Sequence, residues 1–262
     1  ADPSPAVGQA LMRFLEGDDP FKRRLELLVL GLPAGEADEL MMLMKESRGA
    51  WAMLLGGRGG RALFLGNGFS GTPVALGTLG FSVTVVEQSA ARLRFAKDRA
   101  AALAPGTTTA GAAGGDAELP FRDGSFDLVV LEGGLPGPST GWGFTLDELH
   151  RVSRGELLVT ADNRLGYKRS TGRRGAFRRH PLHLLREVLH PSRGERALPA
   201  TRAAVRGAGG EAEAYSLYPH AREFSHVVAL DGPRPRLTIG PRERKNRLKV
   251  LGARLGLFPW LT

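Results

Sequence analysis

The sequence predicts an α/β protein in which helices cover both faces of a mostly parallel sheet. From Arg61 onward, short apolar or β-branched runs alternate with Gly-rich turns and helix-like stretches, as expected for parallel strands joined by crossover helices. The run Leu128–Leu131 is continuously apolar, which is typical of a strand buried on both faces. Residues 9–30 instead show a helical period of apolar positions. We therefore expect a doubly wound sheet preceded by a helical lead-in.

Each element of the sheet domain can be placed on the chain. The expected strands are Ala62–Leu65, Ser82–Glu87, Phe126–Leu131 and Glu156–Thr160. The expected crossover helices lie near Pro73–Leu79, Ala90–Leu103 and Leu146–Ser153.

The flanking regions are predicted from the same periodicities. In the lead-in, Asp18-Asp19-Pro20 separates two short helices, and a third helix is expected over about Ala34–Met53. After the sheet, a helical stretch is expected at Leu182–Leu189, two strands at Glu213–Tyr218 and His226–Leu230, and a basic helix at Arg242–Leu257. The two late strands suit an antiparallel pair that would complete the sheet.

These elements predict three parts of the chain. They are a helical cap over residues 1–50, a domain over residues 51–232 with a basic insertion at about 167–212, and a basic tail over residues 233–262.

Composition limits the chemistry. The chain has no cysteine, which excludes disulfides, thiolate metal sites and cysteine nucleophiles. No apolar run approaches the length of about 20 residues needed to span a membrane, and no signal segment opens the sequence, so we expect a cytoplasmic protein. His180, His183 and His190 lie on or beside one expected helix, but their spacing does not predict a metal site.

Charge is unevenly distributed along the chain. Residues 1–150 hold 13 Lys and Arg against 18 Asp and Glu, a net charge of −5, whereas residues 151–262 hold 23 against 9, a net charge of +14. A basic half favours an acidic partner, such as a phosphate-bearing substrate, nucleic acid or an anionic membrane surface. A solvated Arg-rich surface with no partner is the alternative.

A glycine loop and an acidic residue together predict a nucleoside site. The first expected strand runs into Gly66-Asn67-Gly68 and restarts as a helix, so the backbone can approach a ligand and offer amide groups. Glu87 ends the second expected strand, 21 residues beyond Gly66. An acidic residue at that place can accept hydrogen bonds from both ribose hydroxyls, which fits either a dinucleotide or S-adenosylmethionine (SAM).

The segments GDAELPF at residues 115–121 and DGSFDLVV at residues 123–130 distinguish between these ligands. They resemble the class I SAM-dependent methyltransferases, which carry a similar acidic residue, Leu-Pro-Phe turn and following strand. The resemblance implies a Rossmann-like fold, SAM as cofactor, an Asp116 contact to the adenine amino group and an Ala117 amide against the adenine ring. Phe64 stands where members commonly have an acidic residue that holds the methionine end. The expected cofactor-binding residues are Gly66, Asn67, Gly68, Glu87, Gln88, Asp116, Ala117 and Glu132.

The acceptor should lie over the carboxyl ends of the last parallel strands. The run ADNRLGYK at residues 161–168 and YPHARE at residues 218–223 look similar to a subgroup of bacterial methyltransferases associated with glycan and surface-polysaccharide genes. The similarity implies O-methylation of a polar, anionic or glycan-like acceptor. Asp162 and His220 are the candidate bases, and the expected acceptor contacts are Asn163, Arg164, Tyr167 and Arg222.

Two other functions stay open. The basic half is compatible with RNA methylation, and Phe64 is compatible with a non-catalytic module that binds an anionic partner. The basic loop at residues 167–180 fits phosphate binding or a lid, and the tail at residues 241–257 fits either peripheral membrane contact or packing on the protein itself.

Overall fold

The computed structural model describes residues 4–55, 59–104, 110–112, 118–135, 142–160, 203–206, 213–220 and 223–230. The chain divides into two units, which are considered separately. The first contains residues 1–162 and 220–224, and the second contains residues 163–219 and 225–262. No helix in the described part of the chain is long and apolar enough to cross a membrane.

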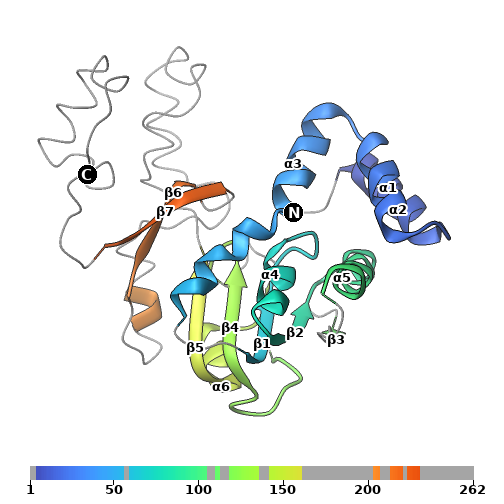
Figure 1. Ribbon diagram of the computed structural model, residues 1–262. Helices are drawn as coiled ribbons and strands as arrows, with labels where there is room; N and C mark the ends of the chain where they lie inside the picture. Colours follow the sequence, from blue (N-terminus) through green and yellow to red (C-terminus); the bar gives the residue numbers. More distant parts are fainter. Residues whose placement is uncertain are drawn as a thin grey trace, which may run out of the picture. The chain divides into compact units, whose positions relative to one another are not determined.

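A five-stranded parallel sheet forms the centre of the first unit (Figure 1). Its strands are β1 (Gly60–Leu65), β2 (Phe81–Val86), β3 (Ala110–Ala112), β4 (Phe126–Glu132) and β5 (Ser153–Thr160). Their order is β3-β2-β1-β4-β5. The chain therefore adds β2 and β3 on one side of β1 and then β4 and β5 on the other, so the switch point lies between β1 and β4. Ligands of open α/β sheets bind at such a switch point, beyond the carboxyl ends of the strands.

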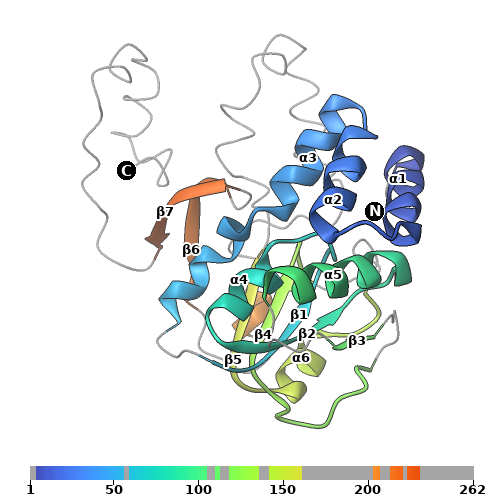
Figure 2. The same cartoon turned by 45° about the vertical axis from the view of Figure 1, so that its right-hand side comes forward.

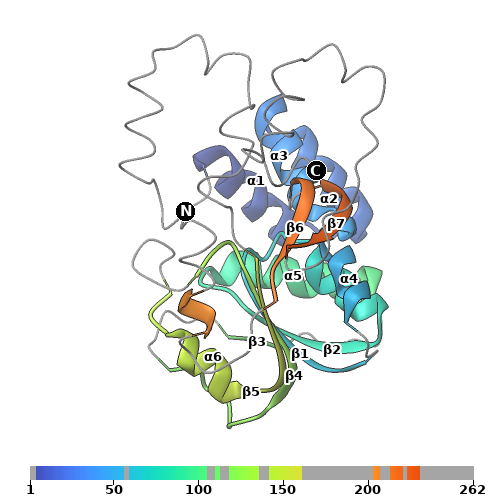
Figure 3. The same cartoon turned by 90° about the vertical axis from the view of Figure 1, so that its left-hand side faces the viewer.

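Helices cover both faces of this sheet, as predicted. The helices α4 (Thr72–Thr78) and α5 (Ala90–Leu103) lie on one side and α6 (Leu146–Val152) on the other (Figure 3). Because successive residues of a strand face opposite sides, Leu63 and Leu65 join the core cluster that contains Leu149 of α6. Phe64 is also fully buried. The fold class and the four expected strands are confirmed, whereas β3 was not expected.

Three helices precede the sheet: α1 (Pro5–Glu16), α2 (Phe21–Leu30) and α3 (Ala34–Met44). The first two lie beside α5 (Figure 2). Phe14 and Phe21 contact Phe95 of α5, with ring centroids 5.0 and 6.2 Å away, and Phe69 of the glycine loop contacts the same ring at 4.9 Å. The lead-in therefore shares one apolar cluster with the loop that follows β1.

The predicted third helix, about Ala34–Met53, is wrong in its second half. The helix ends at Met44, Lys45 is extended, and a 3₁₀ segment η1 (Glu46–Leu54) follows. The helix ends through contacts with residues that are distant in the sequence. The carbonyl of Leu43 accepts a hydrogen bond from the amide of Gly71 at 2.9 Å, and the carbonyl of Met44 accepts one from Arg99. A local helical period contains no information about such partners.

Late strands β6 (Tyr215–His220) and β7 (Glu223–Ala229) hydrogen-bond to each other as a separate two-stranded sheet. The amide of Leu230 donates to the carbonyl of Ala214 at 2.8 Å, which joins the end of β7 to the start of β6 and makes the pair antiparallel. Two strands were thus correctly expected here, but they do not extend the five-stranded sheet. The expected helices at Leu182–Leu189 and Arg242–Leu257 lie outside the described residues.

Candidate cofactor site

The glycine loop, residues 66–71, connects β1 to α4 at the carboxyl edge of the sheet. Its glycines are required by close packing. A Cβ on Gly66 would lie 2.8 Å from the ring of Phe64, and one on Gly68 would lie 2.6 Å from the carbonyl oxygen of Arg92. Asn67 folds the loop back on itself, since its Oδ1 accepts from the amide of Phe69 at 3.0 Å. The loop is therefore shaped by protein contacts before any ligand binds.

Glu87 follows β2 directly and is only 2% exposed. Its Oε2 accepts from the amide of Gly68 at 2.7 Å, and its Oε1 accepts from the amide of Ser89 at 3.0 Å and from Nη2 of Arg92 at 2.7 Å. The structure thus places Glu87 against the glycine loop, where the spacing of the two motifs predicts it. A carboxylate has about four acceptor positions, so the contacts of the described residues leave one for a ligand hydroxyl.

Arg92 is a residue of this site that the sequence analysis missed. It lies in the first turn of α5, is 9% exposed, and pairs with Glu87. A buried carboxylate needs such a partner, because an isolated buried charge is strongly disfavoured. In a chain with 36 Lys and Arg, no pattern separates this arginine from exposed ones.

Glu132 ends β4, on the other side of β1 from Glu87. Its Oε1 accepts from Oγ1 of Thr72 at 3.1 Å and lies 3.0 Å from Nη2 of Arg48. Directly after it, Gly133 and Gly134 have φ angles of 102° and 115°, which favour glycine. Both of their amides donate to the carbonyl of Thr160, so the chain turns towards β5 at this edge.

Arg99 supports the glycine loop from α5. Its Nη1 donates to the carbonyl of Phe69 at 3.0 Å, and its Nη2 donates to Met44 and to Oε1 of Glu46 at 2.7 Å. Burial lowers the pKa of Arg99, and the bond to Glu46 opposes that effect. One guanidinium therefore joins the end of α3 to the loop.

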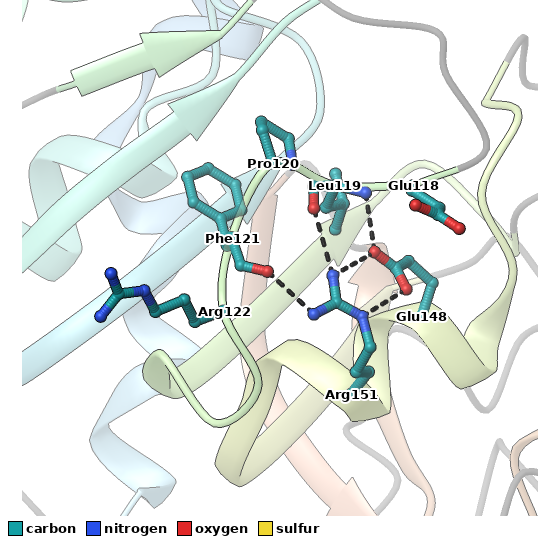
Figure 4. A pocket seen from close by; sticks show the side chains of 7 residues that line it. All are labelled: Glu118, Leu119, Pro120, Phe121, Arg122, Glu148 and Arg151. Carbon is teal, nitrogen blue, oxygen red and sulfur yellow. Dashed lines mark hydrogen bonds and ion pairs between the residues drawn. The ribbon is translucent and has the colours of Figure 1, made fainter.

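The Leu-Pro-Phe turn at residues 119–121 is attached to α6 (Figure 4). Glu148 Oε1 accepts from the amide of Leu119 at 2.7 Å, and Arg151 donates to the carbonyls of Leu119 and Phe121 at 3.1 and 2.8 Å. The bond to Arg151 is the main cause that lowers the pKa of Glu148, and the same bond raises the pKa of Arg151. These residues line an open pocket of about 500 Å³. The attachment fixes the segment that directly follows Asp116 and Ala117.

The structure brings part of the predicted site together. Gly66, Gly68, Glu87 and Glu132 meet at the carboxyl edge, and Gln88 is exposed beside Glu87. His220 is the last residue of β6, and its side chain is not described. Seven further predicted residues lie outside the described part of the chain: Asp116, Ala117, Asp162, Asn163, Arg164, Tyr167 and Arg222.

Comparison with known proteins agrees with this arrangement. Residues 63–156 match the family model described as "Methyltransferase domain". A search of curated proteins found no match to the sequence.

Several solved structures are similar to this chain at low sequence identity, and the first of the following has a TM-score above 0.5. A protein of Nostoc punctiforme described as a "putative O-methyltransferase" is 14% identical, with a TM-score of 0.52, over 85% of this chain and 66% of that one. A "putative s-adenosyl-l-methionine-dependent methyltransferase" of Methanococcus maripaludis is 14% identical, with a TM-score of 0.46, over 86% and 99% of the two chains. A SAM-dependent methyltransferase of Aquifex aeolicus is 13% identical, with a TM-score of 0.45, over 76% and 91%.

The matched segment begins inside β1 and ends inside β5, so it contains the glycine loop, Glu87 and Glu132. Residues 63–156 thus carry a methyltransferase domain, and the cofactor that this domain indicates is S-adenosylmethionine.

Proposed function

We propose that this chain transfers a methyl group from SAM to an oxygen atom of a polar, anionic or glycan-like acceptor. The observation that carries the proposal is the meeting of Glu87 with Gly68 at the switch point of the sheet, within the segment that matches a methyltransferase domain. The RNA and non-catalytic alternatives rest on charge and on Phe64, respectively, and the acceptor assay below distinguishes them from the proposal.

The residues at this edge fit the nucleoside half of the cofactor. Glu87 is held by three donors and retains one acceptor position for a ribose hydroxyl. We assign the adenine contacts to Asp116 and Ala117, which precede the turn anchored by Glu148 and Arg151. The backbone of Gly66-Asn67-Gly68 lies between the strands that carry Glu87 and Glu132.

The chain's contribution to transfer would be alignment and proton removal. When bound, SAM supplies an electrophilic methyl group on a sulfonium. An acceptor hydroxyl oxygen must be held in line with the carbon–sulfur bond that breaks, with water excluded. We propose that the carboxylate of Asp162 or the imidazole of His220 acts as the base that accepts the hydroxyl proton. Asn163, Arg164, Tyr167 and Arg222 would hold the acceptor, and the net charge of +14 over residues 151–262 favours an anionic one.

Calorimetry with SAM and S-adenosylhomocysteine (SAH) tests the cofactor. Both should bind the full chain at sub-millimolar concentration. Glu87→Gln should weaken SAH binding about tenfold or more, because the amide replaces an acceptor for ribose hydroxyls with a donor. Glu26→Gln is the matched control, since Glu26 lies on the exposed face of α2 and pairs only with Arg23 among the described contacts. Absence of SAM and SAH binding to folded protein would refute the proposed function.

The acceptor class needs a second measurement. Methyl transfer from radiolabelled SAM can be assayed against uncharged oligosaccharides, phosphorylated sugars and RNA at several salt concentrations. Transfer to sugars supports the proposal. RNA binding that weakens steeply with salt, together with methyl transfer to RNA, would favour the RNA methyltransferase alternative.

A further inference from the structure

A buried arginine at the carboxyl edge has donors that its surroundings do not satisfy. Arg48 lies in η1, and only 7% of its surface is exposed. Its Nη2 pairs with Glu132 at 3.0 Å. Its Nε and Nη1 are buried and have no hydrogen-bond partner among the described residues. Buried donors are nearly always paired, and an unpaired one carries its full desolvation penalty. The guanidinium therefore has the capacity for a further acceptor.

The partner of Arg48 is held in a fixed place. Oε1 of Glu132 accepts from Thr72 at the start of α4 and pairs with Arg48. The Cβ of Glu132 lies close to the glycine loop, 3.1 Å from where a Cβ on Gly66 would stand. A cation and an anion are thus fixed together beside the first loop glycine, at the end of β4.

The position of this pair relative to Glu87 defines the ligand that could reach both. In the strand order β2-β1-β4, Glu87 follows β2 and Glu132 ends β4, with the glycine loop between them. Neighbouring strands lie about 4.8 Å apart, so the two carboxylate-bearing strands are about 10 Å apart. A nucleoside linked to a short amino-acid chain spans such a distance, with its ribose near β2 and its amino acid near β4.

The charges of the pair match an α-amino acid. A carboxylate would accept from the unpaired donors of Arg48, and an ammonium group would donate to Glu132. Phe64 cannot serve this end, because it is apolar and fully buried. We propose that Arg48 and Glu132 bind the zwitterionic amino-acid end of SAM and SAH. This assignment rests on the proposed function, and it adds a residue of the lead-in to the cofactor site.

Two ligands that differ only at this end provide the test. 5′-Methylthioadenosine retains the nucleoside and the sulfur of SAH but lacks the carboxylate and the ammonium group. Isothermal titration of the full chain should show Arg48→Met weakening SAH binding at least tenfold while changing methylthioadenosine binding less than twofold. Arg23→Met is the matched control, since the Arg23 side chain is 58% exposed on α2, and it should change neither affinity.

Ligand variation keeps the test independent of protein folding. If Arg48→Met does not fold, the wild-type chain should still bind SAH at least tenfold more tightly than its decarboxylated analogue, which lacks only the carboxylate. Equal loss of SAH and methylthioadenosine binding in Arg48→Met would overturn the assignment, because a purely structural role acts on both. Equal wild-type affinity for SAH and the decarboxylated analogue would also overturn it. Binding of neither SAH nor methylthioadenosine to wild type would refute the proposed function itself.

Discussion

Replacing Gly71 with alanine would test how closely the lead-in packs against the glycine loop. Its φ of −74° and ψ of −14° suit any residue, so alanine would suffer no backbone strain there. The obstacle is space. A Cβ would lie 2.1 Å from the carbonyl oxygen of Lys45, 2.3 Å from its carbonyl carbon and 2.7 Å from the amide nitrogen of Glu46. All three atoms are backbone, so no side-chain rotation relieves the clash.

The expected cost of Gly71→Ala follows from three effects. Forcing a methyl group into packed structure costs about 1–3 kcal/mol. Moving the two segments apart weakens the bond from the Gly71 amide to the carbonyl of Leu43, now 2.9 Å long, which contributes about 1 kcal/mol. Alanine also has less conformational freedom than glycine in the unfolded chain, which stabilises the folded state by about 0.4–1 kcal/mol. We therefore expect the variant to lower the free energy of unfolding by about 1–3.6 kcal/mol.

Urea denaturation followed by circular dichroism measures this change. Gly8→Ala is the control, because Gly8 lies within α1 and a Cβ there meets no atom within 4 Å. That variant should stabilise the protein by about 0.5–1 kcal/mol, the usual gain for alanine over glycine inside a helix. A Gly71→Ala variant that unfolds within about 0.5 kcal/mol of wild type, while Gly8→Ala behaves as expected, would contradict the predicted backbone clash.

Further predictions concern the charged contacts of the site. Glu87→Ala should lower the free energy of unfolding by about 3–5 kcal/mol, because it leaves Arg92 buried without its anion; a loss under 1 kcal/mol in urea denaturation would contradict the pairing. The lowered pKa of Glu148 stabilises the folded state above the carboxyl's usual pKa of about 4.3, and this contribution disappears as pH falls through the folded pKa. Glu148→Gln should therefore flatten the fall in urea midpoint between about pH 5 and pH 3, and an unchanged pH profile would exclude this source. Arg151→Met should lower the urea midpoint at neutral pH, because two carbonyls and Glu148 lose a donor, whereas the same change at exposed Arg23 should leave the midpoint unchanged.

The core of the site was predictable because its signals are local. The expected strand ending at Glu87 and the loop beginning at Gly66 both follow from short-range patterns, and parallel strands bring such ends to one edge of the sheet. The observed bond between Gly68 and Glu87 is the direct result. By contrast, β3 is the segment Ala110-Gly111-Ala112, which lacks the β-branched residues that identify strands.

What the sequence did not predict depends on partners far along the chain. Arg48 and Arg99 are under 10% exposed, and their partners lie at least 29 residues away in the sequence. Arg92 is also under 10% exposed, although its partner Glu87 is only five residues away. Nothing in the neighbouring residues distinguishes them from solvated arginines. The end of α3 at Met44 has the same origin, because its stop signal is supplied by Gly71 and Arg99.

The bonds of Arg99 also constrain how this protein can move. Since one side chain holds both the carbonyls of the glycine loop and the end of α3, neither segment can open without breaking the same contacts. Local opening should therefore involve both at once, as a single cooperative unit. In hydrogen exchange, the amides of Gly71 and Ser70, which donate to Leu43 and Asn67, should exchange at closely similar rates. Any event that displaces the amino-terminal helices would then be transmitted to the loop beside Glu87, over a path that contains no residue of the sheet.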